Sequence, residues 1–322
     1  MVHSFIKAAL VGSNSFGKYL LGIICIGFTA MIIGGIPAFI VFGYSDNPEA
    51  ATEMNFEAAG ISPALGLTLM LMPFVFGLLA ALFTVKWIHE RPWRTLITPN
   101  KHINWKKVGV GALIWLILLT AFELEAYRAN PDNYVWTFEA AQFFPVLIVT
   151  LLLIPLQTTF EEVLFRGYFM QGLGIGLRYP IIALVFTSVV FGALHLGNPE
   201  ISEYGTWLIW SYIQIGLMFG LVTLLDEGLE LALGVHAMNN IYASVIVTFP
   251  GSALEMPALF TMQEMDAEMM YLYSTIAEIL FILICAYIYK WGNWRKLFQQ
   301  VSTLKSKTTA ESVIESENWL EE

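Results

Sequence analysis

The chain has 322 residues, of which 57% are hydrophobic and only 13% are charged, and its mean hydropathy is +0.65. Soluble globular domains carry about 25% charged residues, so this composition excludes a soluble protein and predicts an integral membrane protein. The net charge of −10 argues against nucleic-acid binding, which needs a basic surface.

Apolar runs of about 20 residues, the length that crosses the hydrocarbon core of a bilayer as a helix, recur along the whole chain. We expect eight spans, at about 19–43, 64–88, 108–127, 143–172, 179–197, 206–225, 228–249 and 271–290. The fourth span is overlong, and only a short polar turn separates the sixth from the seventh. The predicted fold class is therefore an all-α, polytopic membrane protein with about eight transmembrane helices.

Basic residues lie before the first span, between the second and third, and after the eighth. The largest group comprises Lys86, Arg91, Arg94, Lys101, Lys106 and Lys107. The loops between these segments are acidic, as at Glu200 and Glu203, and Arg128 is an exception. By the positive-inside rule, both termini are cytoplasmic and the number of spans is even.

These features divide the chain into four parts. Residues 1–142 hold three helices and a basic cytoplasmic loop at 88–107, and residues 143–250 hold a core of four helices. A loop and the last helix occupy 251–290, and a cytoplasmic tail occupies 291–322. We expect a multi-pass protein of a bacterial-type cell membrane.

The fourth span contains ionisable residues in the run Glu161-Glu162-Val163-Leu164-Phe165-Arg166. An ionised group at membrane depth costs several kcal/mol unless it is paired or hydrated, so such groups are functional candidates. Residues four apart share a helix face, whereas adjacent residues diverge by about 100°. We therefore expect Glu162 to pair with Arg166, and Glu161 to point elsewhere and remain free for chemistry.

Two of the five histidines lie in other spans, while His3, His89 and His102 lie in predicted aqueous segments. His195 follows Phe191 by four residues, so that Phe191 could wall the same pocket. Glu161 and His195 lie nearly equally far along the chain from the turn between their spans, which predicts similar depths on antiparallel helices.

The seventh span carries His236 and Asn240, which also share a helix face. His236 lies close to the next cytoplasmic turn, so it meets Glu161 and His195 only if residues 167–178 project into the cytosol, which is the arrangement we favour. Each group has a structural interpretation by itself, as interhelical hydrogen bonding or packing. Glu278, which stands alone in the eighth span, is as readily structural as functional.

Together these residues resemble the CAAX prenyl protease and bacteriocin-processing (CPBP) family of intramembrane proteases, in particular CAAX prenyl protease 2. The family pattern is Glu-Glu with Arg four residues after the second Glu, then Phe-x-x-x-His, then His-x-x-x-Asn, each on its own transmembrane helix. The matching residues, in order over about 143–250, are Glu161-Glu162…Arg166, Phe191…His195 and His236…Asn240.

The resemblance implies peptide-bond hydrolysis within the membrane. It makes Glu161 the general base for the attacking water, His195 a holder of that water, and His236 with Asn240 the donors to the tetrahedral oxyanion. The residues that it assigns to support of the site are Glu162, Arg166 and Phe191. The expected partners are the lipid bilayer and a peptide or membrane-protein substrate, with lipidated, bacteriocin-like and signal-like peptides as candidates.

Metal use has two interpretations. Glu161, His195 and His236 could hold a zinc ion with an open position for water. The His-Glu-x-x-His helix of zinc proteases is absent from the sequence, and the resemblance to eukaryotic prenyl-protein proteases implies catalysis without bound metal. We therefore expect a glutamate-dependent mechanism that requires no cofactor.

Two other functions remain as alternatives. A non-catalytic CPBP-like scaffold or immunity protein would keep the fold without the reaction. A proton-coupled transporter would also place Glu and His relays in the membrane. The transporter ranks last, because the sequence shows no paired halves with broken helices.

Overall fold

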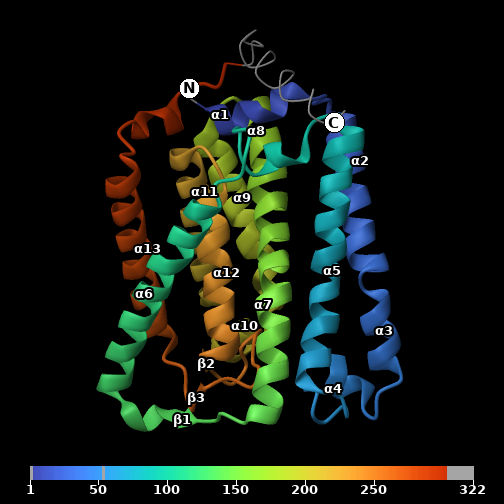
Figure 1. Ribbon diagram of the computed structural model, residues 1–322, viewed down its shortest axis with the longest axis vertical. Helices are drawn as coiled ribbons and strands as arrows, with labels where there is room; N and C mark the ends of the chain where they lie inside the picture. The colour runs from blue at the N-terminus through green and yellow to red at the C-terminus, as the bar shows by residue number, and fades with distance from the viewer. Residues whose placement is uncertain (1–2, 53–54, 303–322) are drawn as a thin grey trace.

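The computed structural model describes residues 3–52 and 55–302, and it is a bundle of long helices that run side by side (Figure 1). Within the described residues, seven helical stretches are long and apolar enough to cross a membrane: Phe16–Gly43, Pro63–Ile88, Trp105–Ala129, Ala140–Leu177, Pro180–Gly197, Thr206–Asp226 and Ala267–Tyr289. The protein is thus an all-α, multi-pass membrane protein, as predicted. The predicted tail lies outside the described residues from 303 onward.

Thirteen α-helices are described: α1 (Ser4–Lys7), α2 (Phe16–Phe28), α3 (Ile36–Gly43), α4 (Pro48–Thr52), α5 (Pro63–Phe83), α6 (Trp105–Ala129), α7 (Ala140–Glu162), α8 (Gln171–Leu177), α9 (Pro180–Leu194), α10 (Pro199–Tyr204), α11 (Ile209–Asp226), α12 (Glu230–Val245) and α13 (Ala267–Tyr289). Three π-helical segments extend them: η2 (Thr29–Ile33), η3 (Thr84–Ile88) and η6 (Val163–Met170). The short 3₁₀ turns are η1 (Ala8–Val11), η4 (Trp93–Leu96), η5 (Pro131–Asn133), η7 (His195–Gly197), η8 (Thr206–Leu208) and η9 (Trp294–Phe298).

Polar side chains mark where several of the long helices begin. Asn104 accepts a hydrogen bond from the Lys107 amide at 3.2 Å and caps α6. Asp266 accepts one from the Met269 amide at 2.9 Å and caps α13. Such caps satisfy backbone N–H groups that the first helical turn leaves unpaired.

Helix α12 is where the structure departs from eight equivalent spans. It has only 16 residues, or about 24 Å at 1.5 Å per residue, which is less than the roughly 30 Å of the hydrocarbon core. It packs mainly on α6 and α7. Its polar residues need protein partners rather than lipid, which is why this segment lies inside the bundle.

Two glycines allow the close packing of α6 against α12. A Cβ at Gly234 would lie 2.0 Å from the Val108 carbonyl oxygen, and one at Gly111 would lie 2.7 Å from the Leu231 carbonyl oxygen. Small residues at such crossings let two helix backbones approach closely. The position of α12, and of the polar residues it carries, is therefore fixed by backbone contact.

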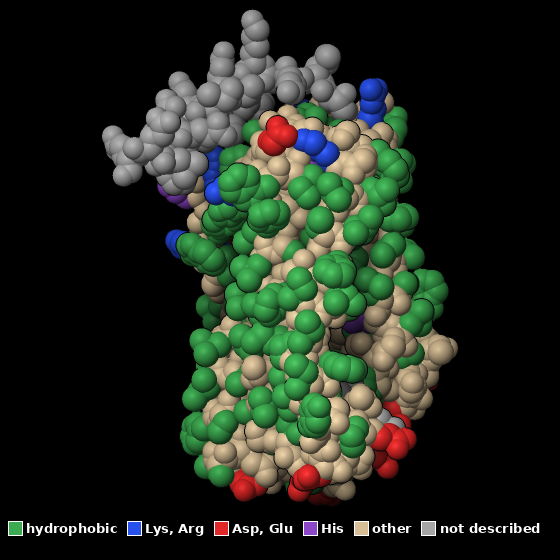
Figure 2. Space-filling view, turned by 90° about the vertical axis from the view of Figure 1, so that its right-hand side faces the viewer, with side chains coloured by type: hydrophobic (Ala, Val, Ile, Leu, Met, Phe, Trp, Pro, Cys, Tyr) green, Lys and Arg blue, Asp and Glu red, His purple; other side chains and the backbone are tan. Residues whose placement is uncertain are grey.

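One end of the bundle carries a three-stranded sheet made of β1 (Tyr134–Trp136), β2 (Val247–Thr248) and β3 (Phe260–Met262). The strand order is β1-β3-β2, with β1 antiparallel and β2 parallel to the central strand. Figure 2 shows acidic side chains at this end and Lys and Arg side chains at the opposite end. This charge separation agrees with the predicted pattern, and the assignment of the basic end to the cytoplasm stays a prediction.

The turn between α11 and α12 ties the two ends of the described chain together. The Glu227 carboxylate accepts hydrogen bonds from the His3 amide at 3.0 Å and the Phe5 amide at 2.9 Å. It also accepts one from the Lys296 ammonium at 3.0 Å. The first and last described segments therefore lie at the same end of the bundle.

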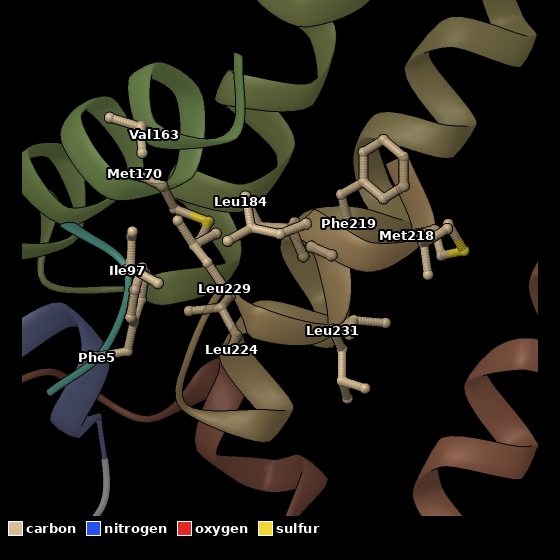
Figure 3. Close-up of a cluster of buried hydrophobic side chains, with 14 of the residues drawn as sticks. Phe5, Ile97, Val163, Met170, Leu184, Met218, Phe219, Leu224, Leu229 and Leu231 are labelled. Carbon is tan, nitrogen blue, oxygen red and sulfur yellow. The ribbon is translucent and has the colours of Figure 1, made fainter. Parts of the chain in front are cut away.

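The largest cluster of buried apolar side chains holds the helices of the polar motifs in place (Figure 3). It joins Val163 and Met170 of η6 to Leu184 of α9 and Phe219 of α11. The cluster combines residues from all four parts of the predicted division, including Phe5, Trp115, Phe219, Phe281 and Leu297.

The loop predicted at 88–107 is folded rather than simply solvated. His89, expected in an aqueous segment, is fully buried. Its Nδ1 lies 2.8 Å from the Ser13 carbonyl oxygen and its Nε2 lies 2.8 Å from the Tyr168 hydroxyl. The sequence does not show this burial, because it depends on the N-terminal segment packing over the loop.

Candidate active site

The two adjacent glutamates lie where α7 passes into the π-helical segment η6. Glu161 is 8% exposed and Glu162 is completely buried. A π-helical turn widens the helix locally and is frequent at functional sites. Here it follows immediately after Glu162 and contains Arg166.

Glu162 and Arg166 form the ion pair that their spacing predicts. Arg166 Nη1 donates to Glu162 Oε1 at 2.9 Å, and both side chains are fully buried. Arg166 Nη2 donates to the Gly216 carbonyl oxygen on α11 at 2.7 Å. Its guanidinium also lies over the Phe191 ring, 4.8 Å from the centroid. Arg166 therefore both neutralises Glu162 and joins η6 to α9 and α11.

His236 on α12 lies between the two glutamates. Its Nδ1 is 2.9 Å from Glu162 Oε1, and its Nε2 is 3.4 Å from Glu161 Oε2. The ring stacks on Phe219, with centroids 4.7 Å apart. Glu161 does point away from Arg166, but it is not isolated, because the same imidazole approaches it. Helical phase does separate the two carboxylates, but one imidazole has two nitrogens and reaches both.

Glu161 is nevertheless only half satisfied. Its Oε1 accepts a hydrogen bond from Gln157 Nε2 at 2.6 Å. Its Oε2 is buried and has no hydrogen-bond partner within the described part of the chain, because the 3.4 Å approach of His236 is long for such a bond. A buried carboxylate oxygen without a donor is costly and calls for an explanation.

Asn240 reaches the same carboxylate through Gln157. Asn240 Nδ2 donates to Gln157 Oε1 at 3.1 Å, and Asn239 Nδ2 donates to Asn240 Oδ1 at 3.2 Å. Gln157 was missed at the sequence level, although it lies four residues before Glu161 on the same helix face. Asn240 and Gln157 thus form a second hydrogen-bonded connection between α12 and Glu161, in addition to the His236 contact.

His195 lies at the end of α9, beside this group. Its Nδ1 is 2.7 Å from the Phe191 carbonyl oxygen. A carbonyl only accepts, so Nδ1 carries the proton and a neutral ring keeps the Nε2 lone pair available. The Phe191 ring lies 4.6 Å from the His195 ring and 6.1 Å from the His236 ring. Among the described residues no hydrogen bond or ion pair joins His195 directly to Glu161.

The comparisons with known proteins cover this region. Residues 140–242 match the family model described as "Rce1-like: Type II CAAX prenyl endopeptidase Rce1-like". The chain is 30% identical over 265 residues to the "Uncharacterized protein YyaK" of Bacillus subtilis (strain 168), which covers 81% of this chain and 87% of the relative. The chain belongs to the Rce1-like family. No solved structure matches it.

Membership of the Rce1-like family identifies the protein in general terms as a membrane-embedded peptidase of the CAAX-protease type. The matched range contains all three sequence elements, from Glu161 to Asn240. Figure 2 shows a hollow midway along the bundle in which a histidine side chain is visible. The polar cluster of this Rce1-like protein lies on helices α7, α9 and α12, all within the matched range.

The alternative zinc set of Glu161, His195 and His236 is not gathered around one point in this Rce1-like protein. His195 keeps Nε2 available, whereas both His236 nitrogens face carboxylates. In residues 3–52 and 55–302, no three His, Cys, Asp or Glu side chains gather where one metal ion could bind them. We therefore derive no step through a metal, and the need for a cofactor stays a question for measurement.

Tyr212 on α11 is the second residue that the sequence did not mark. Its ring stacks on His195 with centroids 4.3 Å apart and planes inclined by 22°. It belongs to none of the three motifs, and no spacing rule connects position 212 to position 195. Only the packing of α11 against α9 brings them together.

Proposed function

We propose that this protein hydrolyses peptide bonds inside the membrane, with Glu161 as the general base. The observation that carries the proposal is the Oε2 atom of Glu161, a buried carboxylate oxygen that lacks a donor. A water molecule there would supply the missing hydrogen bond and would be aligned for deprotonation. General-base catalysis requires such contact between the base and the proton that it removes.

The charges around Glu161 favour this role. Arg166 balances Glu162, so the second carboxylate, Glu161, has His236 as its nearest counterpart. These two groups would share one proton between a carboxylate and an imidazole. The proton can therefore move without creating an unbalanced charge in a medium of low dielectric constant.

The proposed reaction has two steps. In the first, water gives a proton to Glu161 as its oxygen bonds to the peptide carbonyl carbon. In the second, the C–N bond breaks and the proton passes from Glu161 to the leaving amine. His236 in its protonated form and the Asn240 amide would donate to the oxyanion, and Asn240 would exchange its bond to Gln157 for this contact. Fixed donors in a water-poor site stabilise developing charge strongly.

His195 would complete the water site. Its Nε2 lone pair is free to accept a hydrogen bond from the attacking water, because Nδ1 is committed to the Phe191 carbonyl. The substrate would be a peptide or membrane protein that reaches mid-depth in the bilayer, such as a lipidated, bacteriocin-like or signal-like peptide. Membrane proteomics of cells with active protein and with the Glu161→Gln protein would identify it by its uncut form.

The test is the Glu161→Gln variant, which keeps the shape of the side chain and removes the base. Loss of a positioned base lowers rates by about 10²–10⁴-fold, so cleavage by the purified variant should fall by that factor with an unchanged melting temperature. Glu278→Gln is the matched control, because Glu278 is also a buried membrane carboxyl (5% exposed) outside the motifs. Its cleavage rate should equal that of the wild type.

Cleavage by Glu161→Gln at the wild-type rate would overturn the proposal. If the biological role survives in an inactive variant, the protein acts as a scaffold instead. The same purified protein decides metal use, because full activity after chelation, with no metal detected by elemental analysis, contradicts the zinc alternative.

A further inference from the structure

Beyond the three motifs, a buried glutamate lies one layer outside His195. Glu200 is in α10, in a loop whose acidic residues were expected at the membrane surface, yet it is only 8% exposed. Its carboxylate accepts hydrogen bonds from the Tyr212 hydroxyl and from Asn198 Nδ2, the latter at 3.3 Å. Its other oxygen accepts the Ala253 amide at 2.9 Å. Glu200 therefore joins the segment after His195, helix α11 and the loop after β2.

His195 needs support of this kind because it stands at the end of its helix. Its backbone has φ −89° and ψ 1°, outside the regular helical range. Phe191 contacts the ring and fixes Nδ1 through its carbonyl oxygen. The stacked Tyr212 ring limits rotation of the imidazole, and the Tyr212 hydroxyl is itself held by Glu200 and by Asn198 Nδ2 at 2.9 Å.

We propose that Glu200 is a positioning residue of the reaction, acting through Tyr212 to hold the His195 ring so that Nε2 faces the attacking water. The inference rests on the proposed function, since it concerns the orientation of His195 in that reaction. Glu200 touches neither substrate nor water in this scheme. Its carboxylate fixes the Tyr212 hydroxyl, and the Tyr212 ring fixes the imidazole plane.

The same carboxylate connects the site to the end of the bundle that carries the sheet. Besides the Ala253 bond, Tyr204 donates from its hydroxyl to the Pro250 carbonyl oxygen at 2.8 Å. Gly251 has φ +76°, and a Cβ there would lie 3.4 Å from the Glu203 Cβ, so α10 and this loop are in close contact. The position of the loop is therefore transmitted to Tyr212 and, through it, to His195.

Tyr212→Phe and Glu200→Gln test the inference in the full-length protein, using the substrate that the proteomic comparison identifies. Tyr212→Phe keeps the stacked ring and removes only the hydroxyl. A small misorientation of a reacting group costs about 10–100-fold in rate, so each variant should lose about that factor in kcat while KM changes by less than about twofold. Because both changes break the same connection, kcat of the double variant should be no lower than kcat of the less active single variant. Glu203→Gln, an exposed glutamate in the same helix, is the control and should match the wild type.

A second arm separates positioning from mere structural support. In a His195→Gln background, Glu200→Gln should lower kcat no further, because the residue that it orients is gone. Loss of general stability would instead add to the His195→Gln defect. Wild-type kcat for both single variants, or full additivity with His195→Gln, overturns the inference. If that result is found while the Glu161→Gln protein is inactive, only the inference about Glu200 fails and the proposed function stands. If the Glu161→Gln protein is active, the proposed function itself fails.

Discussion

The long helical stretch from α7 to α8 carries two buried polar clusters that differ in kind. The first, the Glu161 cluster, contains Glu161, Glu162, Arg166 and His236, with two carboxylates facing one imidazole. The second, the Gln171 cluster, lies near the basic end and contains His89, Arg91, Tyr168 and Gln171. Both clusters are almost free of solvent contact.

The difference lies in the partners. In the Gln171 cluster, Gln171 Nε2 donates to the Thr95 carbonyl oxygen at 2.7 Å and His89 bonds the Ser13 carbonyl oxygen. Those backbone contacts tie loops to the helix, and they indicate a structural role. In the Glu161 cluster, ionisable side chains face each other, and two carboxylate oxygens, Glu161 Oε2 and Glu162 Oε2, have no hydrogen-bond partner among the described residues. The atoms without a partner in the Gln171 cluster are Nε and Nη2 of Arg91, which are donors and cannot accept a proton. The Gln171 cluster therefore holds loops in place, whereas the Glu161 cluster is the one at which we propose proton transfer.

Arg166→Met should give the largest loss of stability, because it leaves the Glu162 carboxylate buried without its cation. Breaking a fully buried pair in this way costs about 3–5 kcal/mol in the free energy of unfolding. The Glu162→Gln/Arg166→Met double variant should regain much of that loss, which a double-mutant cycle of thermal stability measures.

Lys107→Met is the matched control for Arg166→Met. Lys107 also pairs with a carboxylate, Asp226 at 2.8 Å, but its side chain is 24% exposed at the end of the bundle. The Asp226 side chain is itself only 3% exposed, but it keeps a hydrogen bond from Trp291 Nε1 at 3.2 Å. Removal of the partly exposed lysine lets water reach Asp226, so this variant should lose clearly less stability than Arg166→Met. Equal losses would show that burial does not distinguish the two pairs.

Gln171→Leu should destabilise the protein without changing the rate of the catalytic step. It removes the acceptor of Arg91 Nη1 at 2.8 Å and the donor to the Thr95 carbonyl oxygen. Each buried group left without a partner costs about 1–3 kcal/mol. The melting temperature should therefore fall, while kcat per folded molecule stays at the wild-type value. A kcat loss comparable to that of Glu161→Gln would mean that the Gln171 cluster also takes part in the reaction.

The membrane class, the long helices and the Glu162–Arg166 pair could be predicted because each follows from local pattern, either an apolar run or a spacing of four residues. The approach of His236 to both glutamates could not, because it depends on how α12 crosses α6 and α7. Tyr212 and Glu200 were missed for the same reason: stacking and hydrogen bonds between distant segments leave no periodic signal. The short α12 was counted as a full span because composition alone does not show which apolar segment is enclosed by protein.

The burial of His89 leads to the smallest predicted effect, and it tests the Gln171 cluster. Burial lowers its pKa below the ordinary 6.5, with Arg91 and Lys18 acting in the same direction and the bond to the Ser13 carbonyl oxygen opposing them. The folded state therefore prefers the neutral ring, and the unfolded chain binds the extra proton. Stability from His89 is fully present above about pH 6.5 and declines as the pH falls below it, by at most about 1.4 kcal/mol per pH unit.

The His89→Gln variant isolates this contribution from that of other titrating groups. It should be less stable than the wild type at pH 7.5, because two buried hydrogen bonds and two ring contacts are altered. The difference between the two proteins should narrow as the pH is lowered to 5.5, since only the wild type is penalised by protonation of this ring. Thermal melts in detergent across that range measure it. A difference that stays constant or widens would mean that position 89 does not carry a buried neutral histidine, and the Gln171 cluster would then need a different electrostatic description.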